Sequence, residues 1–149
     1  MAGYVPTSKS VVWATPDDFF AKVHAEFNFE LDVAADAENA KCRRFFTEED
    51  DGLSKPWKRL DGGPASVWCN PPYGRQISQW IAKARDESWT GSTVVLLVPA
   101  RTDTRWFHDD VLACKRAEVR FLRGRLKFGG ASAGCPFPVM LVIFRPGPY

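Results

Sequence analysis

Five residues, Asn70-Pro71-Pro72-Tyr73-Gly74, directly follow an apolar run that is typical of a buried strand. The Asn70 side-chain oxygen and the Pro71 carbonyl oxygen could both accept hydrogen bonds from an amine on an aromatic ring, which would stabilise the positive charge that develops as its nitrogen attacks an electrophile. Two consecutive prolines stiffen the segment and add no competing N–H donor. Tyr73 offers a face on which a planar base can stack, and Gly74 lets the chain turn closely past it. The pattern predicts a site that activates an aromatic amine.

The alternative is that the same residues form only a stiff turn between a strand and a helix. Asparagine, two prolines and tyrosine after an apolar strand are, however, far more specific than a turn requires. The tetrapeptide resembles the catalytic motif of the adenosylmethionine-dependent amino-methyltransferases, which modify adenine N6, cytosine N4 or a glutamine side chain. The motif alone does not choose among these acceptors.

Length and composition restrict the class of protein. Residues 1–149 predict a single domain with one core and no separate domain for target recognition. No apolar stretch approaches the ~20 residues that span a bilayer, and Met1–Ser10 lacks the apolar core of a signal peptide, so we expect a cytoplasmic protein. The four cysteines are scattered and only two histidines are present, which predicts reduced thiols and no metal site. Cys69 lies beside the motif, but no histidine is near it in sequence, which favours packing over nucleophilic catalysis.

Positive charge is concentrated in the last third of the chain. Residues 101–149 contain 9 Lys and Arg against 4 Asp and Glu, whereas residues 1–100 contain 11 against 14. Six basic residues surround one expected strand and the turn after it, which fits an edge that contacts phosphates. A solvated face without a partner is the alternative, and charge alone leaves both open. The six are Lys115, Arg116, Arg120, Arg123, Arg125 and Lys127.

Apolar runs alternate with helical patterns, which predicts an α/β fold with a mostly parallel sheet. We expect a first helix with Thr15 as N-cap and Pro16 at its first position, a second between the second and third strands, and a third over 103–113. The last two strands are expected to form a C-terminal antiparallel hairpin. The expected strands are Phe29–Ala34, Ala65–Cys69, Thr93–Val98 at the centre, Ala117–Leu122, Leu126–Phe128 and Val139–Phe144.

A sheet of this kind binds ligands beyond the carboxyl ends of its strands, at a switch in strand order. Three segments fall at such ends, namely Asp32–Ala35, Asn70–Gly74 and Pro99–Thr104. A folded sheet would bring them to one crevice, although they are distant in sequence. We therefore expect a cofactor on one side of that crevice and the target amine on the other.

Beyond the motif, six blocks in register cover nearly the whole chain and are similar to the small phage-type Dam DNA N6-adenine methyltransferases. The resemblance implies a Rossmann-like, adenosylmethionine-dependent methyltransferase fold. One departure is that Asp32-Val33-Ala34-Ala35 stands where other methyltransferases have a glycine-rich turn. The blocks are Trp13-x-Thr15-Pro16 with Phe19-Phe20, Leu31–Ala35 with Asn39-Ala40, Asp50–Leu53 with Trp57, Trp68–Gly74, Val98–Thr104 with Trp106–His108, and Gly124–Gly129 with Pro136–Pro138.

Two groups of site residues follow from the resemblance. Adenine N6 would be positioned and polarised by Asn70, Pro71, Pro72 and Tyr73. The cofactor S-adenosylmethionine would be held at its methionine end by Trp13, Thr15 and Pro16, at its α-ammonium group by Asp32 beside Ala34, and at its adenine amine by Asp51. A plain helix start is the alternative for Thr15 and Pro16, and a solvated acidic loop is the alternative for Asp51.

A third group would contact DNA. Phe128 would stack on or wedge beside the extruded base, with packing in the hairpin as an equal alternative. Phosphates or the borders of the target base would be contacted by Arg101, Thr102, Arg105, Arg123, Arg125 and Lys127.

The sequence thus predicts an enzyme that transfers a methyl group from S-adenosylmethionine to N6 of a flipped-out adenine in DNA. RNA or a protein glutamine is the alternative acceptor, and a cofactor- or DNA-binding protein without turnover is the alternative from another class. DNA is the expected partner of a monomer, with a weak dimer as alternative, in the bacterial host cell of a phage or prophage. The recognition sequence is open between a short site such as GATC, common in the family, and loose methylation.

Overall fold

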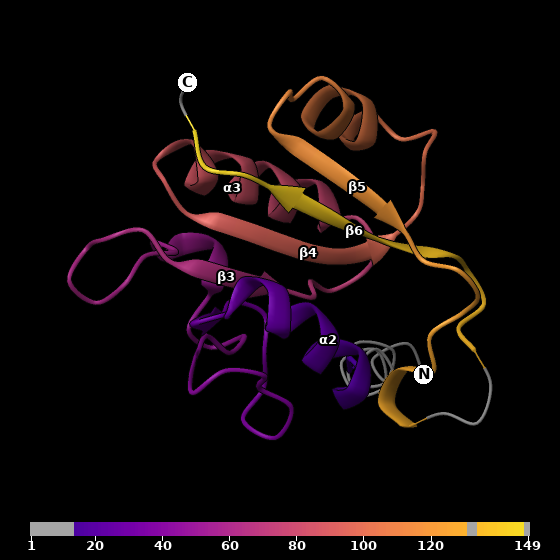
Figure 1. Cartoon of the computed structure of the whole chain (residues 1–149), viewed down its shortest axis with the longest axis horizontal. Coiled ribbons are helices and arrows are strands. Elements are labelled where there is room, and N and C mark those ends of the chain that lie inside the picture. The colour runs from indigo at the N-terminus through magenta and orange to yellow at the C-terminus, as the bar shows by residue number, and fades with distance from the viewer. Residues whose placement is uncertain (1–13, 131–133, 148–149) are drawn as a thin grey trace.

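The computed structural model describes residues 14–130 and 134–147, which build a six-stranded sheet with the order β2-β1-β3-β4-β6-β5 (Figure 1). β2, β1, β3 and β4 run parallel, whereas β6 is antiparallel to both β4 and β5. β6 therefore lies inside the sheet, and β5 forms an edge. The strands are β1 (Leu31–Asp32), β2 (Arg44–Phe45), β3 (Ser66–Cys69), β4 (Thr93–Pro99), β5 (Ala117–Phe121) and β6 (Val139–Phe144).

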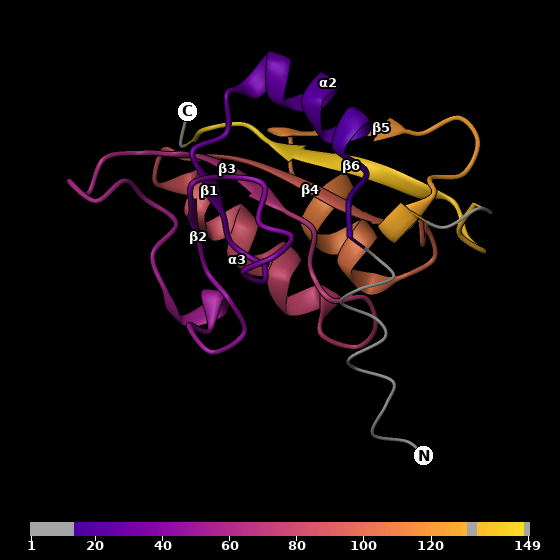
Figure 2. The ribbon, with the colours of Figure 1, turned by 90° about the horizontal axis from the view of Figure 1, so that it is seen from below.

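Helices cover both faces of the sheet (Figure 2). α2 lies on one face, and α3 lies on the other together with η2, a helical segment of π type. None of the helices within 14–130 and 134–147 has the length and apolar character needed to cross a membrane. The helical elements are α2 (Asp17–Phe27), η1 (Gly52–Ser54), α3 (Ile77–Trp89), η2 (Trp106–Leu112) and η3 (Phe128–Gly130).

The core forms where the central strands meet the apolar stripes of the helices. Residues 94–98 of β4 are fully buried, because this strand has a neighbour on each side and helices over both faces. Ile77, Ile81 and Ala84 recur at helical spacing on α3 and are at most 2% exposed. From the opposite face, Phe20 of α2 joins the same core. The pairing of β4 with β3 and β6 fixes the strand register and hence the position of the loops at the strand ends.

The α/β class and the mostly parallel sheet are confirmed. β3, β4, β5 and β6 lie where the apolar runs predict them, with changes of one residue at their ends. β1 is shorter than the expected Phe29–Ala34, because only Leu31 and Asp32 pair with both neighbouring strands. β2 and η1 were not predicted, since elements of two or three residues carry no periodicity.

The expected hairpin between Leu126–Phe128 and Val139–Phe144 is wrong in its first strand. β6 instead pairs with β5 on one side and β4 on the other. Gly124 and Gly129 both have positive φ, 78° and 61°, which turns the chain on either side of the segment. Phe128 then points into the protein, 2% exposed, as part of η3. The C-terminal antiparallel pair exists, but its first strand is β5.

The expected helix starts also need correction. α2 begins at Asp17, its cap position is Pro16 and it has no side-chain cap bond, although the Asp18 carboxylate accepts from the Phe19 N–H of the first turn at 2.8 Å. Thr15 is therefore not the N-cap. The helix expected over 103–113 begins only at Trp106, because the chain first makes a turn closed by the Thr104 N–H and the Arg101 carbonyl at 3.3 Å.

Candidate active site

The loops that carry the motifs meet at one edge of the sheet, because β1, β3 and β4 are parallel and end there together. Residues 33–41 follow β1, 70–76 follow β3 and 100–105 follow β4. β6 runs the other way and begins at this edge, where the Ala100 N–H donates to the Pro138 carbonyl at 2.9 Å. In Figure 1 the edge lies on the right, where α2 also begins. The predicted convergence of the three segments on one edge is confirmed.

Asn70 is joined to the segment that precedes α2. Its Nδ2 donates to Thr15 Oγ1 at 2.9 Å, and Thr15 is only 4% exposed. The adjacent Ala14 carbonyl accepts from the Gly129 N–H at 2.9 Å. The segment 14–16 is thus fixed between the loop after β3 and η3. Trp13, predicted to hold the cofactor with Thr15 and Pro16, lies outside the described residues.

Tyr73 lies in an aromatic cluster rather than at an open surface. It is 7% exposed, and its hydroxyl donates to the Leu97 carbonyl at 3.0 Å. Phe128 and Phe137 meet its ring edge to face, with centroids 6.2 Å and 5.8 Å away. Burial raises the pKa of Tyr73, so the phenol stays protonated. Both Tyr73 and Phe128 are buried in this cluster, and the stacking roles predicted for them stay predictions.

Asp32 ends β1 with its carboxylate buried, 3% exposed. One oxygen accepts from the Ala34 N–H at 3.3 Å and the other from the Lys41 N–H at 2.9 Å. Burial raises the pKa of Asp32 to about 6, against the lowering effect of these two hydrogen bonds. The carboxylate holds both ends of the loop 33–41 at the end of β1. Its predicted contact with the α-ammonium group of the cofactor stays a prediction.

The 47–54 loop, which carries Asp51, is pressed against β1. Asp51 is exposed and has a positive φ of 57°. Gly52 is buried so close to the strand that a Cβ atom there would lie 2.3 Å from the Val33 carbonyl oxygen. Asp51 therefore lies near the carboxyl end of β1, as the cofactor prediction requires. Sequence reasoning missed the part played by Gly52, although a glycine directly after an acidic run was the available signal.

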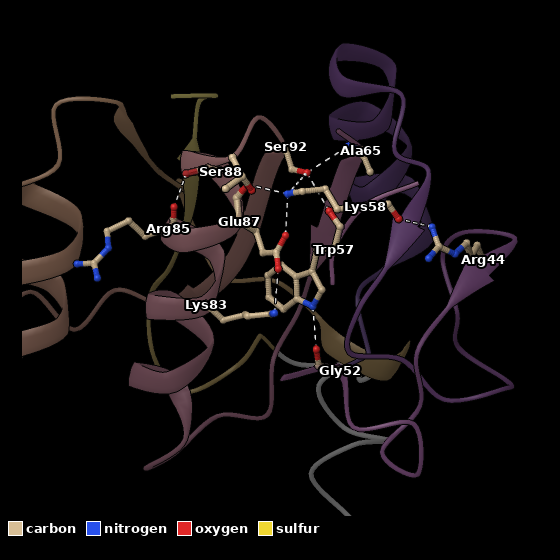
Figure 3. A network of polar contacts seen from close by, with 11 residues as sticks. Arg44, Gly52, Trp57, Lys58, Ala65, Lys83, Arg85, Glu87, Ser88 and Ser92 are labelled. Atoms are coloured by element: carbon tan, nitrogen blue, oxygen red, sulfur yellow. Dashed lines mark hydrogen bonds and ion pairs between the residues drawn. The ribbon is translucent and has the colours of Figure 1, made fainter. Parts of the chain in front are cut away.

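The buried Trp57 contacts the 47–54 loop on its α3 side, beside a group of charged side chains (Figure 3). The Trp57 indole N–H donates to the Gly52 carbonyl at 2.8 Å. Lys83 lies 5.6 Å from the centre of the Trp57 ring and pairs with Glu87 at 2.9 Å. Glu87 also pairs with Lys58 at 2.8 Å. These contacts connect the 47–54 loop to α3. Trp57 belongs to the same sequence block as this loop, whereas nothing in the sequence indicated the ion pairs of Glu87 with Lys58 and Lys83.

Two groups of predicted DNA-contacting residues lie at the same edge of the sheet. Arg101, Thr102 and Arg105 are exposed after β4, and the Arg101 guanidinium lies 6.0 Å from the centre of the Phe137 ring. After β5, which is parallel to β4, the chain presents another set of exposed basic residues. These are Arg123, Arg125 and Lys127, of which Arg125 also donates to the Cys135 carbonyl at 3.3 Å.

The six-residue basic cluster expected from the sequence is divided in the structure. Lys115 and Arg116 precede β5 and so lie at the opposite edge of the sheet from the motif. Arg116 donates to Ser88 and to the Arg145 carbonyl, both at 2.7 Å. Arg120 makes a two-pronged pair with Glu26 at 2.7 Å and 2.8 Å. The expected single phosphate-contacting edge is therefore wrong for these three residues. Lys115 and Arg116 lie at the other end of β5 from Arg123, and Arg120, within the strand, pairs with Glu26 of α2.

Cys69 matches the packing interpretation, whereas Cys42 and Cys114 are only half-buried. Cys69 is fully buried, and burial raises the pKa of its thiol well above its usual range, which removes the thiolate that nucleophilic catalysis needs. Cys42, Cys114 and Cys135 are also free thiols. Within the part of the chain that the structure describes, no three His, Cys, Asp or Glu side chains form a group that could hold a metal ion.

Comparison with known proteins identifies the family. The family model described as DNA N-6-adenine-methyltransferase (Dam) matches residues 3–148. The DNA N-6-adenine-methyltransferase of Haemophilus phage HP1 (strain HP1c1) is 29% identical over 147 residues, covering 93% of this chain and 81% of that protein. That of Escherichia phage T1 is 31% identical over 103 residues, 68% of this chain but only 41% of the T1 protein. A putative methyltransferase of Escherichia coli (strain K12), YfdM, is 40% identical over 63 residues, 41% of this chain and 69% of that protein.

The family model spans nearly the whole chain and both phage proteins carry the same description, so the resemblance drawn from the six blocks is confirmed. The motif Asn70–Tyr73 lies at the end of β3, where ligands of such sheets bind. The protein belongs to the Dam family of DNA N-6-adenine-methyltransferases.

Proposed function

We propose that the protein transfers a methyl group from S-adenosylmethionine to N6 of an adenine that has left the DNA stack. The observation that carries the proposal is the position of Asn70 and Pro71, which directly follow β3 at the edge where the loops after β1 and β4 also lie. Family membership supports the reaction class. The whole activity stays a proposal, because this chain spans 41% of the T1 enzyme and 81% of the HP1 enzyme.

Residues of the motif would supply the electrostatic part of catalysis. Asn70 Oδ1 and the Pro71 carbonyl would accept from the two N–H bonds of adenine N6 and so draw its lone pair out of conjugation with the ring. The same acceptors would stabilise the positive charge that develops on nitrogen during attack, until a proton is lost. Pro72 would keep the turn stiff and free of competing donors. No side chain forms a covalent bond in this scheme, so orientation and charge stabilisation are the whole contribution of the protein.

The residues around the end of β1 fit an adenosylmethionine site in their chemistry. S-adenosylmethionine supplies a methyl group on a positively charged sulfur and therefore needs no further activation. Ala34 and Ala35 are small and would allow a ligand to approach the backbone closely, and Asp51 is an exposed carboxylate next to Gly52, which packs against Val33. Asp32 would act mainly by fixing the loop 33–41, with direct contact to an ammonium group as the alternative. Thr15 and Pro16 lie at the start of α2, whose free N–H groups favour a carboxylate.

DNA would lie across the carboxyl edge of the sheet. Arg101, Thr102 and Arg105 would approach the strand that carries the target base, and Arg123, Arg125 and Lys127 would contact phosphates farther along the duplex. We further propose that residues 1–149 act as one catalytic unit, as a monomer in the cytoplasm of a bacterial host.

Transfer of a labelled methyl group to different acceptors tests this proposal. The protein is incubated with radiolabelled S-adenosylmethionine and, separately, with unmethylated DNA, RNA of the same sequence and a glutamine-containing protein mixture. We expect label in DNA only, and none in DNA whose adenines already carry N6-methyl groups. Label in RNA or protein in preference to DNA would replace the proposed substrate, and cofactor binding without transfer to any acceptor would favour a binding protein.

A further inference from the structure

The Thr15 hydroxyl bonds to the side chain of Asn70, and this contact has a consequence for the proposed reaction. We infer that Thr15 is a positioning residue that holds the Asn70 amide in place beside the substrate amine. Asn70 Nδ2 donates to Thr15 Oγ1 at 2.9 Å, so Oδ1 points the other way. The inference rests on the proposed function, in which Oδ1 must accept from adenine N6.

Orientation matters because the two ends of a primary amide have nearly the same shape and opposite polarity. With Oδ1 toward the substrate, the amide accepts from the amine. After a half-turn about the last side-chain bond, two N–H donors would face two N–H donors, and the stabilisation of the reacting nitrogen would be lost. In the structure the Thr15 oxygen accepts from Nδ2, so Oδ1 lies on the other side of the amide. Because a hydroxyl can also donate, Thr15 holds the amide in place and does not by itself exclude the half-turned form.

The Thr15 hydroxyl is available for this purpose because the helix does not use it. A threonine before Pro-Asp-Asp is a strong candidate for an N-cap, yet α2 begins at Asp17 and makes no side-chain cap bond. Acidic side chains at Asp17 and Asp18 complement the first turn instead. Thr15 is 4% exposed, so its bond to Asn70 is shielded from water.

The segment that carries Thr15 is itself held on both sides. Its neighbour Ala14 accepts from the Gly129 N–H at 2.9 Å, and the Pro16 carbonyl accepts from the Phe20 N–H at 3.0 Å inside α2. A hydroxyl on a fixed backbone orients its partner more firmly than one on a loose loop, because less freedom is lost when the bond forms. The arrangement therefore makes Thr15 a rigid reference for the amide.

Single-turnover methylation of Thr15 variants tests the inference. Thr15→Val keeps the shape and removes the hydroxyl, and we expect the rate at saturating cofactor and DNA to fall roughly tenfold, the loss of one hydrogen bond. Thr15→Ser should restore most of the rate. Thr90→Val, which makes the same chemical change at an exposed position that ends α3, should match the wild type. The inference is overturned if Thr15→Val reaches the wild-type rate at saturating S-adenosylmethionine and binds this cofactor with a tenfold higher dissociation constant. Thr15 would then act by binding the cofactor.

A second measurement does not depend on activity. In ¹⁵N-labelled protein, the Asn70 side-chain NH₂ signals are assigned by their disappearance in Asn70→Ala, and their hydrogen exchange is compared among variants. We expect slow exchange of one Nδ2 proton in the wild type and in Thr15→Ser, and faster exchange in Thr15→Val. Equal exchange in wild type and Thr15→Val would overturn the inference whether or not DNA is methylated. Slow exchange in a wild-type protein that methylates nothing would leave the bond intact and refute the proposed function instead.

Discussion

At the scale of single residues, the proposed reaction depends on which polar groups have partners inside the protein. Asn70 directs its nitrogen to Thr15, and Asp32 directs both oxygens to backbone N–H groups. Both residues were predicted as direct ligand contacts. The structure gives each of them an additional partner in the protein, and the sequence could not indicate these partners because Thr15 is 55 positions away from Asn70.

Asn70→Ala removes the side-chain acceptor and should reduce the single-turnover rate by about 10²- to 10³-fold, the usual effect of losing one preorganised polar group that stabilises developing charge. The dissociation constant of S-adenosylmethionine should stay within twofold, since the change lies on the amine side. Isothermal titration with the cofactor and rapid-quench methylation measure the two quantities. A loss of cofactor binding that parallels the loss of rate would show a folding defect and contradict this role.

Asp32 predicts a pH dependence of stability. Its pKa is raised by burial to about 6 in the folded protein, against 3.8 for an unperturbed carboxyl group. The unfolded chain therefore loses this proton first as the pH rises, so the contribution of Asp32 to the free energy of unfolding falls by about 3 kcal/mol between these two values and is constant above them.

Urea unfolding of wild type and Asp32→Asn across this pH range measures the effect. The free energy of unfolding of the wild type minus that of Asp32→Asn should fall as the pH rises from 3.8 to about 6, because only the wild type carries the titrating group. Parallel curves would show that Asp32 titrates as an ordinary exposed carboxyl group.

At the scale of elements, close backbone contacts set the position of the 47–54 loop. Gly52→Ala would put a Cβ atom 2.3 Å from the Val33 carbonyl oxygen, which belongs to the backbone and cannot turn away. We expect a loss of about 2–3 kcal/mol in the free energy of unfolding, as in other overpacked sites, together with weaker cofactor binding. Thermal and urea denaturation check the first effect, and equilibrium titration checks the second.

Gly62→Ala is the matched control for this prediction. Gly62 has a φ of 87°, but nothing lies within 4 Å of an added Cβ atom. Only the strain of a left-handed residue should appear, about 1 kcal/mol, with cofactor binding unchanged. Equal costs at the two glycines would mean that the contact between Gly52 and Val33 does not position the loop.

Elements with long apolar runs could be predicted from the sequence, and short or irregular ones could not. β4 is a continuous apolar run within seven residues, and α3 carries a clear helical periodicity over thirteen. β2 and η1 carry none, and β1 is defined by two neighbours rather than by its own residues. Leu126–Phe128 resembles a strand in its composition, yet the glycines beside it and the burial of Phe128 against Tyr73 turn it away from the sheet. Tertiary contacts decided these cases.

At the scale of the whole molecule, the sheet separates two groups of basic residues. Arg123 and Lys127 are exposed at the edge that carries the motif, whereas Lys115 lies at the opposite edge. The six-residue cluster expected from the sequence is therefore two surfaces, and only one of them faces the proposed DNA path. Strand direction, which a one-dimensional pattern does not contain, separates them.

This division predicts different effects on the salt dependence of DNA binding. Arg123→Gln combined with Lys127→Gln should weaken binding and reduce the slope of log K against log salt by up to about 1.8, at about 0.9 for each phosphate that is no longer neutralised. Lys115→Gln should leave the slope unchanged. Fluorescence anisotropy with a short duplex over a series of salt concentrations measures both. An equal change of slope in Lys115→Gln and in the Arg123→Gln, Lys127→Gln double variant would mean that DNA does not lie along the edge that carries the motif.

Methylation of adenine N6 in DNA at the carboxyl edge of this sheet is tested best by the identity of the product. Unmethylated genomic DNA is incubated with the protein and S-adenosylmethionine, digested to nucleosides and analysed by mass spectrometry against authentic standards. We expect N6-methyladenine from the wild type and almost none from Asn70→Ala. Formation of N4-methylcytosine, or unchanged DNA from a folded protein with bound cofactor, would refute the proposed reaction.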